Sequence, residues 1–357
     1  MRVTMPNSII YCLLSALLGS QLVLAEPVIA ETVNAAVNTA SEPAPVNDTG
    51  SAPPPESGTA TESVPATDIA TEQAANDSTS TEPDPVGEEC HRIGRKLGSV
   101  SYTECMARHL TASSGRSVLG TPILYKEYPP LPDKRAPLGR VLLIGGIHGD
   151  EYSSVSIVFK WMKTLDRYHS GLFHWHIVPL LNPDGLLRKH SQRMNEHNVD
   201  LNRNFPMHDW ENNTQEYWVN TTLRNPRLYP GRSALSEPES RWLVKEIDNF
   251  KPDIIVSVHA PYGVVDYDGP KDGPHKLGRL YLQLIGTYPG SLGNYVGVQR
   301  KIPVVTIELP YAGIMPTPAE VSGIWIDLVK WLAKNINLKQ SKVAQEPDGK
   351  NSELLSN

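Results

Sequence analysis

Four short, continuous apolar runs restrict the fold of this chain more than any other feature of its sequence. They cover Val141–Ile147, Phe173–Leu181, Asp253–His259 and Pro303–Leu309. Their length and apolar character are typical of strands that are buried on both faces of a sheet. Helical patterns fill the gaps, at Tyr152–Leu165, after Ser236-Glu237-Pro238-Glu239, and at Ser322–Asn335.

Buried strands that alternate with helices predict an α/β domain with a mostly parallel, twisted mixed sheet and helices on both faces. In such sheets, functional side chains gather where strands end and loops begin. The spacing of Ser236 and Glu239 matches a capping box, and Pro238 is tolerated in the first turn of a helix. We therefore expect a helix to start there.

The N-terminal quarter of the chain lacks these patterns. Arg2 precedes an apolar run that ends in Val23-Leu24-Ala25, a small-residue cleavage pattern, so we interpret residues 1–25 as a signal peptide. Whether the signal is cleaved or kept as an anchor stays open. Residues 26–88 are acidic and rich in Pro, Ala, Thr and Ser, and we expect a disordered spacer. The polar residues 339–357 predict a disordered tail.

Export would place the mature protein in the periplasm or outside the cell, where disulfides form. Cys90 and Cys105 remain once the signal is removed, and an even, closely spaced pair predicts a bridge. We expect a small bridged segment over residues 89–120 and a catalytic domain over residues 121–338. We expect no nucleic-acid partner, and no stable membrane insertion after signal removal.

Polar residues follow three of the apolar runs. His148 and Glu151 come directly after the first run, and a His and a Glu at this spacing can converge on one metal ion. His259 ends the third run. Glu308 interrupts the fourth, where a carboxylate is costly unless it is paired or used. Taken singly, His148 and Glu151 fit a loop histidine and a helix cap as well as they fit metal ligands, and a lone histidine at a strand end, such as His259, is more often structural.

More polar residues lie between the second and third runs. Asn182-Pro183-Asp184-Gly185 predicts a turn. Arg193 follows it, and then Asp200-Leu201-Asn202-Arg203, where an amide and a guanidinium suited to gripping a carboxylate stand side by side. His174 and His176 alternate on one predicted strand and could face the same side. No other candidate ligand accompanies them in the sequence, so we expect no second metal site.

The order His-x-x-Glu, Arg, Asp-x-Asn-Arg, strand-end His and strand-end Glu resembles the zinc carboxypeptidases of the carboxypeptidase A superfamily over residues 140–335. Several phrases are similar to the bacterial murein peptide amidases within it: Gly-Gly-Ile-His-Gly-Asp-Glu, Asn-Pro-Asp-Gly-Leu-Leu-Arg, Val-Asp-Leu-Asn-Arg-Asn-Phe-Pro, Ser-Glu-Pro-Glu and Tyr-Pro-Gly-Ser-Leu-Gly. Those enzymes remove meso-diaminopimelate by cutting its bond to γ-D-glutamate in cell-wall peptides. The resemblance thus implies a wall-peptide substrate.

The resemblance also implies one zinc ion held by His148, Glu151 and His259, a ligand set known from catalytic zinc sites. Asp200 would then orient His148 through a hydrogen bond, which fixes the tautomer of the ring and raises its basicity.

For the reaction itself, the resemblance makes Glu308 the base that takes a proton from the attacking water and passes it to the leaving amine. Arg193 would polarise the scissile carbonyl, and Asn202 and Arg203 would bind the terminal carboxylate of the substrate. Digestive carboxypeptidases place a tyrosine ahead of the catalytic glutamate. The position of Tyr288 does not align cleanly with that tyrosine, so the sequence leaves the role of Tyr288 open.

These expectations describe a zinc metallocarboxypeptidase or amidase that acts on a peptide with a free C-terminal carboxylate. When the acidic spacer is left out of the count, the rest of the chain has a positive net charge, which suits an anionic substrate. The loop Pro289–Gly293 matches the region that shapes the terminal side-chain pocket. It holds no acidic residue, so the loop indicates no preference for C-terminal Lys or Arg.

Two alternatives remain. An acylase of the aspartoacylase or succinylglutamate desuccinylase type shares the zinc core and cleaves small N-acyl amino acids. A non-catalytic wall-binding protein would lack a ligand or the base, and here the whole set is present. A serine or cysteine hydrolase is disfavoured, because the sequence shows neither a Gly-x-Ser-x-Gly elbow nor a catalytic-cysteine signature.

Overall fold

In a computed structural model of the chain, residues 84–270 and 272–343 are described. The predicted signal peptide and most of the predicted spacer and tail lie outside them. Two expected boundaries were wrong by a few residues. Helix α1 (Pro85–Lys96) begins inside the range assigned to the spacer, because Asp84 caps it and Pro85 suits a first turn. Helix α6 (Pro318–Val343) continues past residue 338 into the range assigned to the tail.

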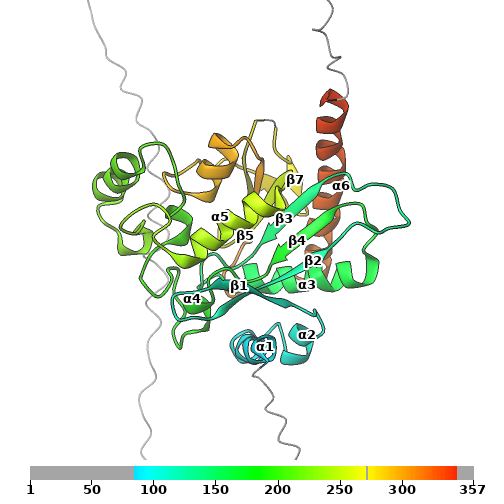
Figure 1. Ribbon diagram of the computed structural model, residues 1–357, viewed down its shortest axis with the longest axis horizontal. Coiled ribbons are helices and arrows are strands. Elements are labelled where there is room, and N and C mark those ends of the chain that lie inside the picture. The colour runs from blue at the N-terminus through cyan, green and yellow to red at the C-terminus, as the bar shows by residue number, and fades with distance from the viewer. Residues whose placement is uncertain (1–83, 271, 344–357) are drawn as a thin grey trace, which may run out of the picture. The chain divides into compact units, whose positions relative to one another are not determined.

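Within the described residues, nine strands form one mixed sheet in the order β1-β2-β4-β3-β5-β9-β6-β8-β7 (Figure 1). The centre of the sheet is parallel and consists of the four predicted runs. They form β4 (His174–Val178), β3 (Arg140–Ile144), β5 (Ile254–His259) and β9 (Val304–Glu308). The predicted parallel centre is therefore confirmed.

The strands outside this centre make the sheet mixed. On one side lie β2 (Pro122–Tyr128) and β1 (Thr111–Arg116), and both pair antiparallel with their neighbours. On the other side β6 (Val264–Asp268) runs antiparallel to β9. Beyond it lie β8 (Leu280–Leu282), parallel to β6, and β7 (Lys276–Leu277).

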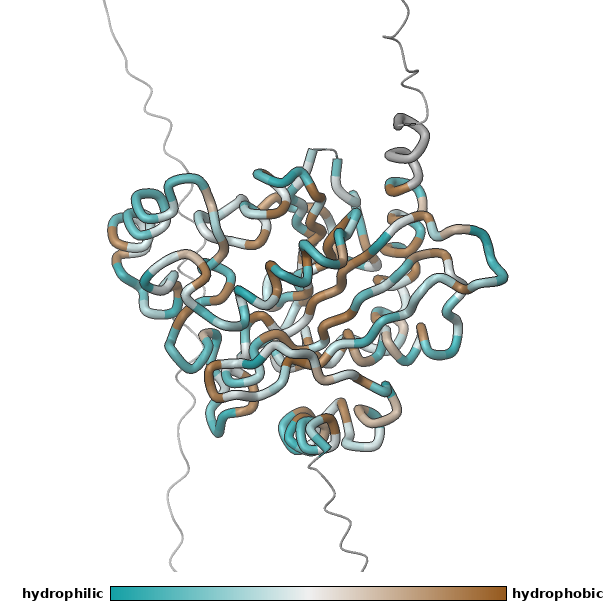
Figure 2. The backbone as a smooth tube through the Cα atoms, viewed as in Figure 1, coloured by the Kyte–Doolittle hydropathy of each residue, from teal (hydrophilic) through white to brown (hydrophobic). Residues whose placement is uncertain are grey.

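Helices cover both faces of the sheet, as predicted. Successive side chains of a strand point to opposite faces, and β3 divides its side chains between two apolar clusters. Its Leu143 packs with α6 and α3 (Tyr152–Tyr168), whereas its Leu142 packs with α5 (Pro238–Phe250) and the short helix η5 (Gly293–Gln299). Figure 2 shows the apolar strands at the centre of these layers. Among the described residues, no helix is long and apolar enough to cross a membrane.

The start of α5 corrects one detail of the sequence interpretation. The residue that precedes the helix is Glu237, and no side chain caps its first turn. Ser236, expected to be the capping residue, instead donates its hydroxyl to the Glu237 carboxylate at 2.7 Å. The predicted capping box is therefore absent, although the helix does begin with Pro238.

A disulfide joins Cys90 of α1 to Cys105 of α2 (Tyr102–Met106), with 5.4 Å between their Cα atoms. Both cysteines are buried in the same apolar cluster as Leu143 of β3. The expected segment 89–120 also contributes β1 to the sheet. The bridged helices and the catalytic domain thus share one core.

We predict that the disulfide stabilises this core. A bridge that encloses about 15 residues contributes about 3 kcal/mol to the free energy of unfolding in the chain-entropy model. The double variant Cys90→Ser, Cys105→Ser should therefore unfold at lower denaturant concentration, and unreduced native protein should show no thiol that alkylates at these positions. Two reactive thiols, or an unchanged unfolding midpoint, would contradict the prediction.

Candidate metal centre

His148 and Glu151 lie in the loop that connects β3 to α3. The loop packs against the short helix α4 (Pro183–Leu187). Gly149 comes so close to the backbone of Gly185 that a Cβ atom there would overlap it. Only glycine permits this approach, which holds His148 and Glu151 in place on either side of it.

The structure brings His148, Glu151 and His259 together. The Nδ1 atom of His148 lies 2.7 Å from Glu151 Oε1 and 3.2 Å from His259 Nδ1. His259 Nδ1 lies 3.2 Å from Glu151 Oε2. One ligand atom from each residue lies within 4.8 Å of the other two, and all three side chains are buried. Two imidazole nitrogens and a carboxylate oxygen form a donor set suited to zinc.

Each histidine is oriented through its other ring nitrogen. His148 Nε2 lies 3.2 Å from Asp200 Oδ1, and His259 Nε2 lies 3.0 Å from Ser257 Oγ. These contacts leave both Nδ1 atoms for a metal. Asp200 was expected in this position, whereas Ser257 was missed. Ser257 stands two residues before His259 on the same strand, so the two side chains lie on the same face of the sheet. This spacing could have identified Ser257 as a partner of His259.

Asp200 also fixes Arg193. Its Oδ2 accepts a hydrogen bond from Arg193 Nε at 2.9 Å, and Arg193 Nη1 lies 3.7 Å from Glu151 Oε1. Burial raises the pKa of Asp200, but the charges of Arg193 and His148 outweigh it and hold that pKa well below its usual range. The carboxylate therefore stays ionised, and Arg193 reaches the metal centre from a fixed ion pair.

Glu151 has the charge state that a metal ligand requires. Burial raises its pKa, but the neighbouring His148 and His259 outweigh this effect, and the net pKa lies well below the ordinary value. Metal binding needs deprotonated ligands, and this carboxylate meets that condition.

Glu308 ends β9 directly beside His259, its partner in the register of β5 and β9. The side chain is buried, and its Oε2 has no hydrogen-bond partner in the described part of the chain. Burial and the negative charge of Glu151 raise the pKa of Glu308 above its ordinary value. A buried carboxylate with a free oxygen beside a metal centre can accept a proton and pass it on.

Arg203 and Asn202 lie in the short helix η1 (Leu201–Arg203). Arg203 is buried, and its Nε lacks a hydrogen-bond partner among the described residues. Its guanidinium carbon lies 4.5 Å from the centre of the Tyr288 ring. The oxygen of the Asn202 amide accepts from Leu292 N at 2.9 Å. Arg203 can therefore receive an anion, and Tyr288, left open above, supports its guanidinium plane.

The predicted turn Asn182–Gly185 has a larger role than its sequence indicates. Asn182 caps α4 and donates its amide to the carbonyls of Ile147 and Arg193, at 3.3 and 3.1 Å. It thus joins the loop of His148 to the segment of Arg193. Nothing in the local pattern predicts these bonds, because both partners come from other parts of the chain.

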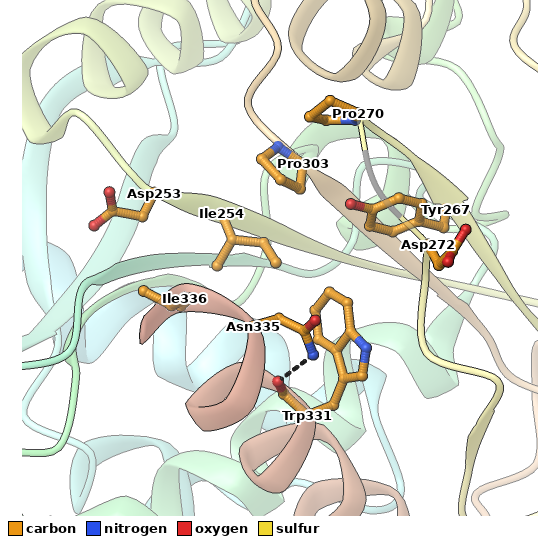
Figure 3. Close-up of a pocket in the computed structure, with 9 residues that line it drawn as sticks. All are labelled: Asp253, Ile254, Tyr267, Pro270, Asp272, Pro303, Trp331, Asn335 and Ile336. Carbon is orange, nitrogen blue, oxygen red and sulfur yellow. Dashed lines mark hydrogen bonds between the residues drawn. The ribbon is translucent and has the colours of Figure 1, made fainter. Parts of the chain in front are cut away.

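Two other features do not belong to the site. His174 and His176 both contact Glu127, at 3.4 and 3.2 Å. His176 Nε2 also lies 3.8 Å from Glu246 Oε2. Among the described residues, the group whose ligand atoms lie close enough together to hold a metal ion is His148, Glu151 and His259. The pocket in Figure 3 lies at the start of β5, near Ile254 and Trp331, whereas His259 ends that strand. Its volume of about 30 Å³ leaves room for little more than water.

The chain is similar to known zinc carboxypeptidases and murein peptide amidases. The model of the zinc carboxypeptidase family matches residues 108–271. A murein peptide amidase A from Vibrio campbellii is 32% identical over 219 residues, which are 59% of this chain and 84% of that protein. The protein of the same name from Escherichia coli K12 is 29% identical over 232 residues, 63% of this chain and 91% of its own.

A crystal structure of a murein-tripeptide amidase from Escherichia coli O157 also matches. It is 26% identical, covers 62% of this chain and 89% of its own, and has a TM-score of 0.43.

We predict that Asp200 positions a metal ligand. Asp200→Asn should weaken zinc binding about tenfold to a hundredfold, because the variant no longer holds His148 by a charged acceptor. Competition with a chromophoric chelator measures the affinity. Asp248→Asn is the matched control, since Asp248 also pairs with an arginine, Arg300, but at the surface. Equal zinc affinity in both folded variants would refute the role.

Proposed function

Since the chain belongs to the zinc carboxypeptidase family, we propose that it is a zinc-dependent amidase of cell-wall peptides. It would hydrolyse the bond between γ-D-glutamate and a terminal meso-diaminopimelate. The names of the relatives, murein peptide amidase A, support this substrate class. The observation that carries the proposed chemistry is the convergence of His148, Glu151 and His259 beside the carboxylate of Glu308, whose Oε2 has no hydrogen-bond partner among the described residues.

The donor set fits a single zinc ion. Both histidines use their remaining nitrogen in hydrogen bonds to Asp200 and Ser257, and Glu151 is ionised. Three protein ligands are typical of a catalytic zinc, which keeps a further position open. When bound, zinc lowers the pKa of water and polarises a carbonyl group.

The side chains around the ligands supply the other parts of hydrolysis. Glu308 takes a proton from the attacking water and delivers it to the leaving amine. Arg193, held by Asp200, donates from Nη1 to the oxyanion that develops on the scissile carbonyl. Arg203 and the Asn202 amide bind the terminal carboxylate, which places the last peptide bond at the metal centre.

The proposed location is the periplasm or the outside of the cell. It rests on Arg2 and the apolar run before Ala25, residues that lie outside the described part of the chain. The disulfide between Cys90 and Cys105 and a wall substrate are both compatible with export.

We predict that Glu308 acts as a base and not as a metal ligand. Glu308→Gln should keep its fold and its zinc but lose at least about a hundredfold in kcat, because the amide cannot accept the proton. Zinc content and peptide turnover are measured on the same sample. In the wild type, a chelator should abolish turnover and added zinc should restore it. Loss of zinc from the variant, or undiminished turnover, would contradict this role.

We predict that the free terminal carboxylate is essential for substrate binding. L-Ala-γ-D-Glu-diaminopimelate amidated at its terminal carboxylate should have a kcat/KM roughly 30- to 150-fold lower than the free acid, because a charge-assisted pair with Arg203 is lost. Arg203→Gln should reduce the difference between the two peptides. The exposed Arg241 supplies the control variant Arg241→Gln.

The same assay includes N-acetyl-aspartate, the type of substrate that an acylase cleaves. Release of diaminopimelate from the free tripeptide supports the proposed amidase. Turnover of N-acetyl-aspartate alone would instead place the protein among the acylases, and equal cleavage of both peptides would refute the carboxylate clamp.

A further inference from the structure

Two buried carboxylates at the start of α5 share one hydrogen-bond donor. Glu237 and Glu239 are both buried, where a carboxylate is costly unless it has partners. Each accepts from the side-chain amide of Asn195, at 2.7 and 3.1 Å. Glu239 also accepts from Val118 N at 3.2 Å. The amide of Asn195 therefore ties another segment of the chain to the start of this helix.

That segment is the turn between Arg193 and Asp200, and Asn195 holds it closed. The side chain of Asn195 is buried, and its Oδ1 accepts from the backbone N–H groups of His197 and Val199, both at 3.1 Å. Its own backbone N–H donates to the carbonyl of Val199 at 3.0 Å. One residue thus fixes the shape of the turn through both its backbone and its side chain.

The two ends of the turn carry groups that meet beside the metal centre. Arg193 Nε donates to Asp200 Oδ2 at 2.9 Å. Outside the turn, the carbonyl of Arg193 accepts from Gly149 N at 3.3 Å, and the N–H of Asp200 donates to the carbonyl of Tyr229 at 2.8 Å. These two anchors come from different parts of the chain, so the turn between them sets how the arginine and the aspartate approach each other.

Helix α5 gives the turn a firm support. Its Leu243 and Ile247 lie fully buried in the same apolar cluster as Leu142 of β3. Because protein interiors are close-packed, a helix held in this way has little freedom to shift against the sheet. The position of the turn is therefore set relative to the strands that carry the metal ligands.

We propose that Asn195 is a positioning residue for Arg193. Tied to Glu237 and Glu239, it holds the arginine where its guanidinium meets the developing oxyanion. This inference rests on the proposed function, because the oxyanion belongs to that reaction. Asn195 acts on a contact that forms in the transition state, so its loss lowers the rate and leaves substrate binding by Arg203 intact.

Asn195→Asp tests this role with the smallest change of shape. The new carboxylate still accepts from the backbone of the turn. It donates nothing to Glu237 and Glu239, and their charges repel it. In the full-length, zinc-loaded protein, we expect kcat and kcat/KM for L-Ala-γ-D-Glu-diaminopimelate to fall together by about tenfold to a hundredfold. An unchanged kcat, or a loss that lies in KM alone, would overturn the inference.

Two further variants test the tie to α5 itself. Adding Glu239→Gln to Asn195→Asp removes one opposing charge and supplies a donor, so the double variant should recover part of the lost rate. A double variant no faster than Asn195→Asp would count against the tie. Asn195→Ser adds no charge, and its hydroxyl is too short to reach the helix. It should lose a similar factor in kcat, which keeps the test valid if Asn195→Asp does not fold.

Asn335→Asp is the matched control. Asn335 also donates its side-chain amide to a partner, the carbonyl of Trp331 at 2.8 Å, but it lies on α6 beside the pocket of Figure 3. Its kcat should equal that of the wild type. An equal loss of rate in the two variants, or loss of zinc from Asn195→Asp, would indicate a general structural effect and reject the positioning role.

A spectroscopic signal separates this inference from the proposed function. In proton–nitrogen correlation spectra, the Nε–H of Arg193 that donates to Asp200 should exchange slowly with solvent, and Arg193→Lys identifies its signal by removing it. We expect faster exchange in Asn195→Asp and no change in Asn335→Asp. If the wild type cleaves no peptide, the proposed function fails, and faster exchange in Asn195→Asp still supports the inference. The same exchange rate in Asn195→Asp as in the wild type would overturn it.

Discussion

The rest of the candidate site depends on the buried carboxylate of Asp200. It contacts the ring of His148, accepts from the guanidinium of Arg193 and accepts from the backbone of Asn202. One anion thus sets the orientation of a metal ligand, of the group proposed to meet the oxyanion, and of the helix that carries Arg203. Because it is fully buried, its charge must be compensated, and Arg193 and His148 provide that compensation.

The parallel centre of the sheet explains why the main site residues could be predicted from sequence. His148, His259 and Glu308 each lie at or just after the carboxyl end of a predicted strand. Parallel strands bring these ends to one edge, so residues far apart in the chain meet there. An apolar run followed by a histidine or a carboxylate is a local signal, and it needs no knowledge of the partner.

Residues whose roles depend on distant partners were harder to predict. Asn182 acts through hydrogen bonds to the carbonyls of Ile147 and Arg193, which lie elsewhere in the fold. Strand β6 was not expected at all, because two aspartates interrupt its short apolar pattern and its partner β9 lies about forty residues later. The ends of α1 and α6 were misplaced for a related reason, since composition describes a stretch of chain but not the residue at which a helix begins or ends.

The glycines between residues 290 and 297 have a consequence for how this site can evolve. At Gly293 the backbone touches the carboxylate of Asp268, so even a methyl group there would displace that side chain. At Gly290 any side chain would press on the backbone of Arg203. Substitutions at Gly290 and Gly293 are therefore constrained, because the fold leaves no space for a side chain at either position.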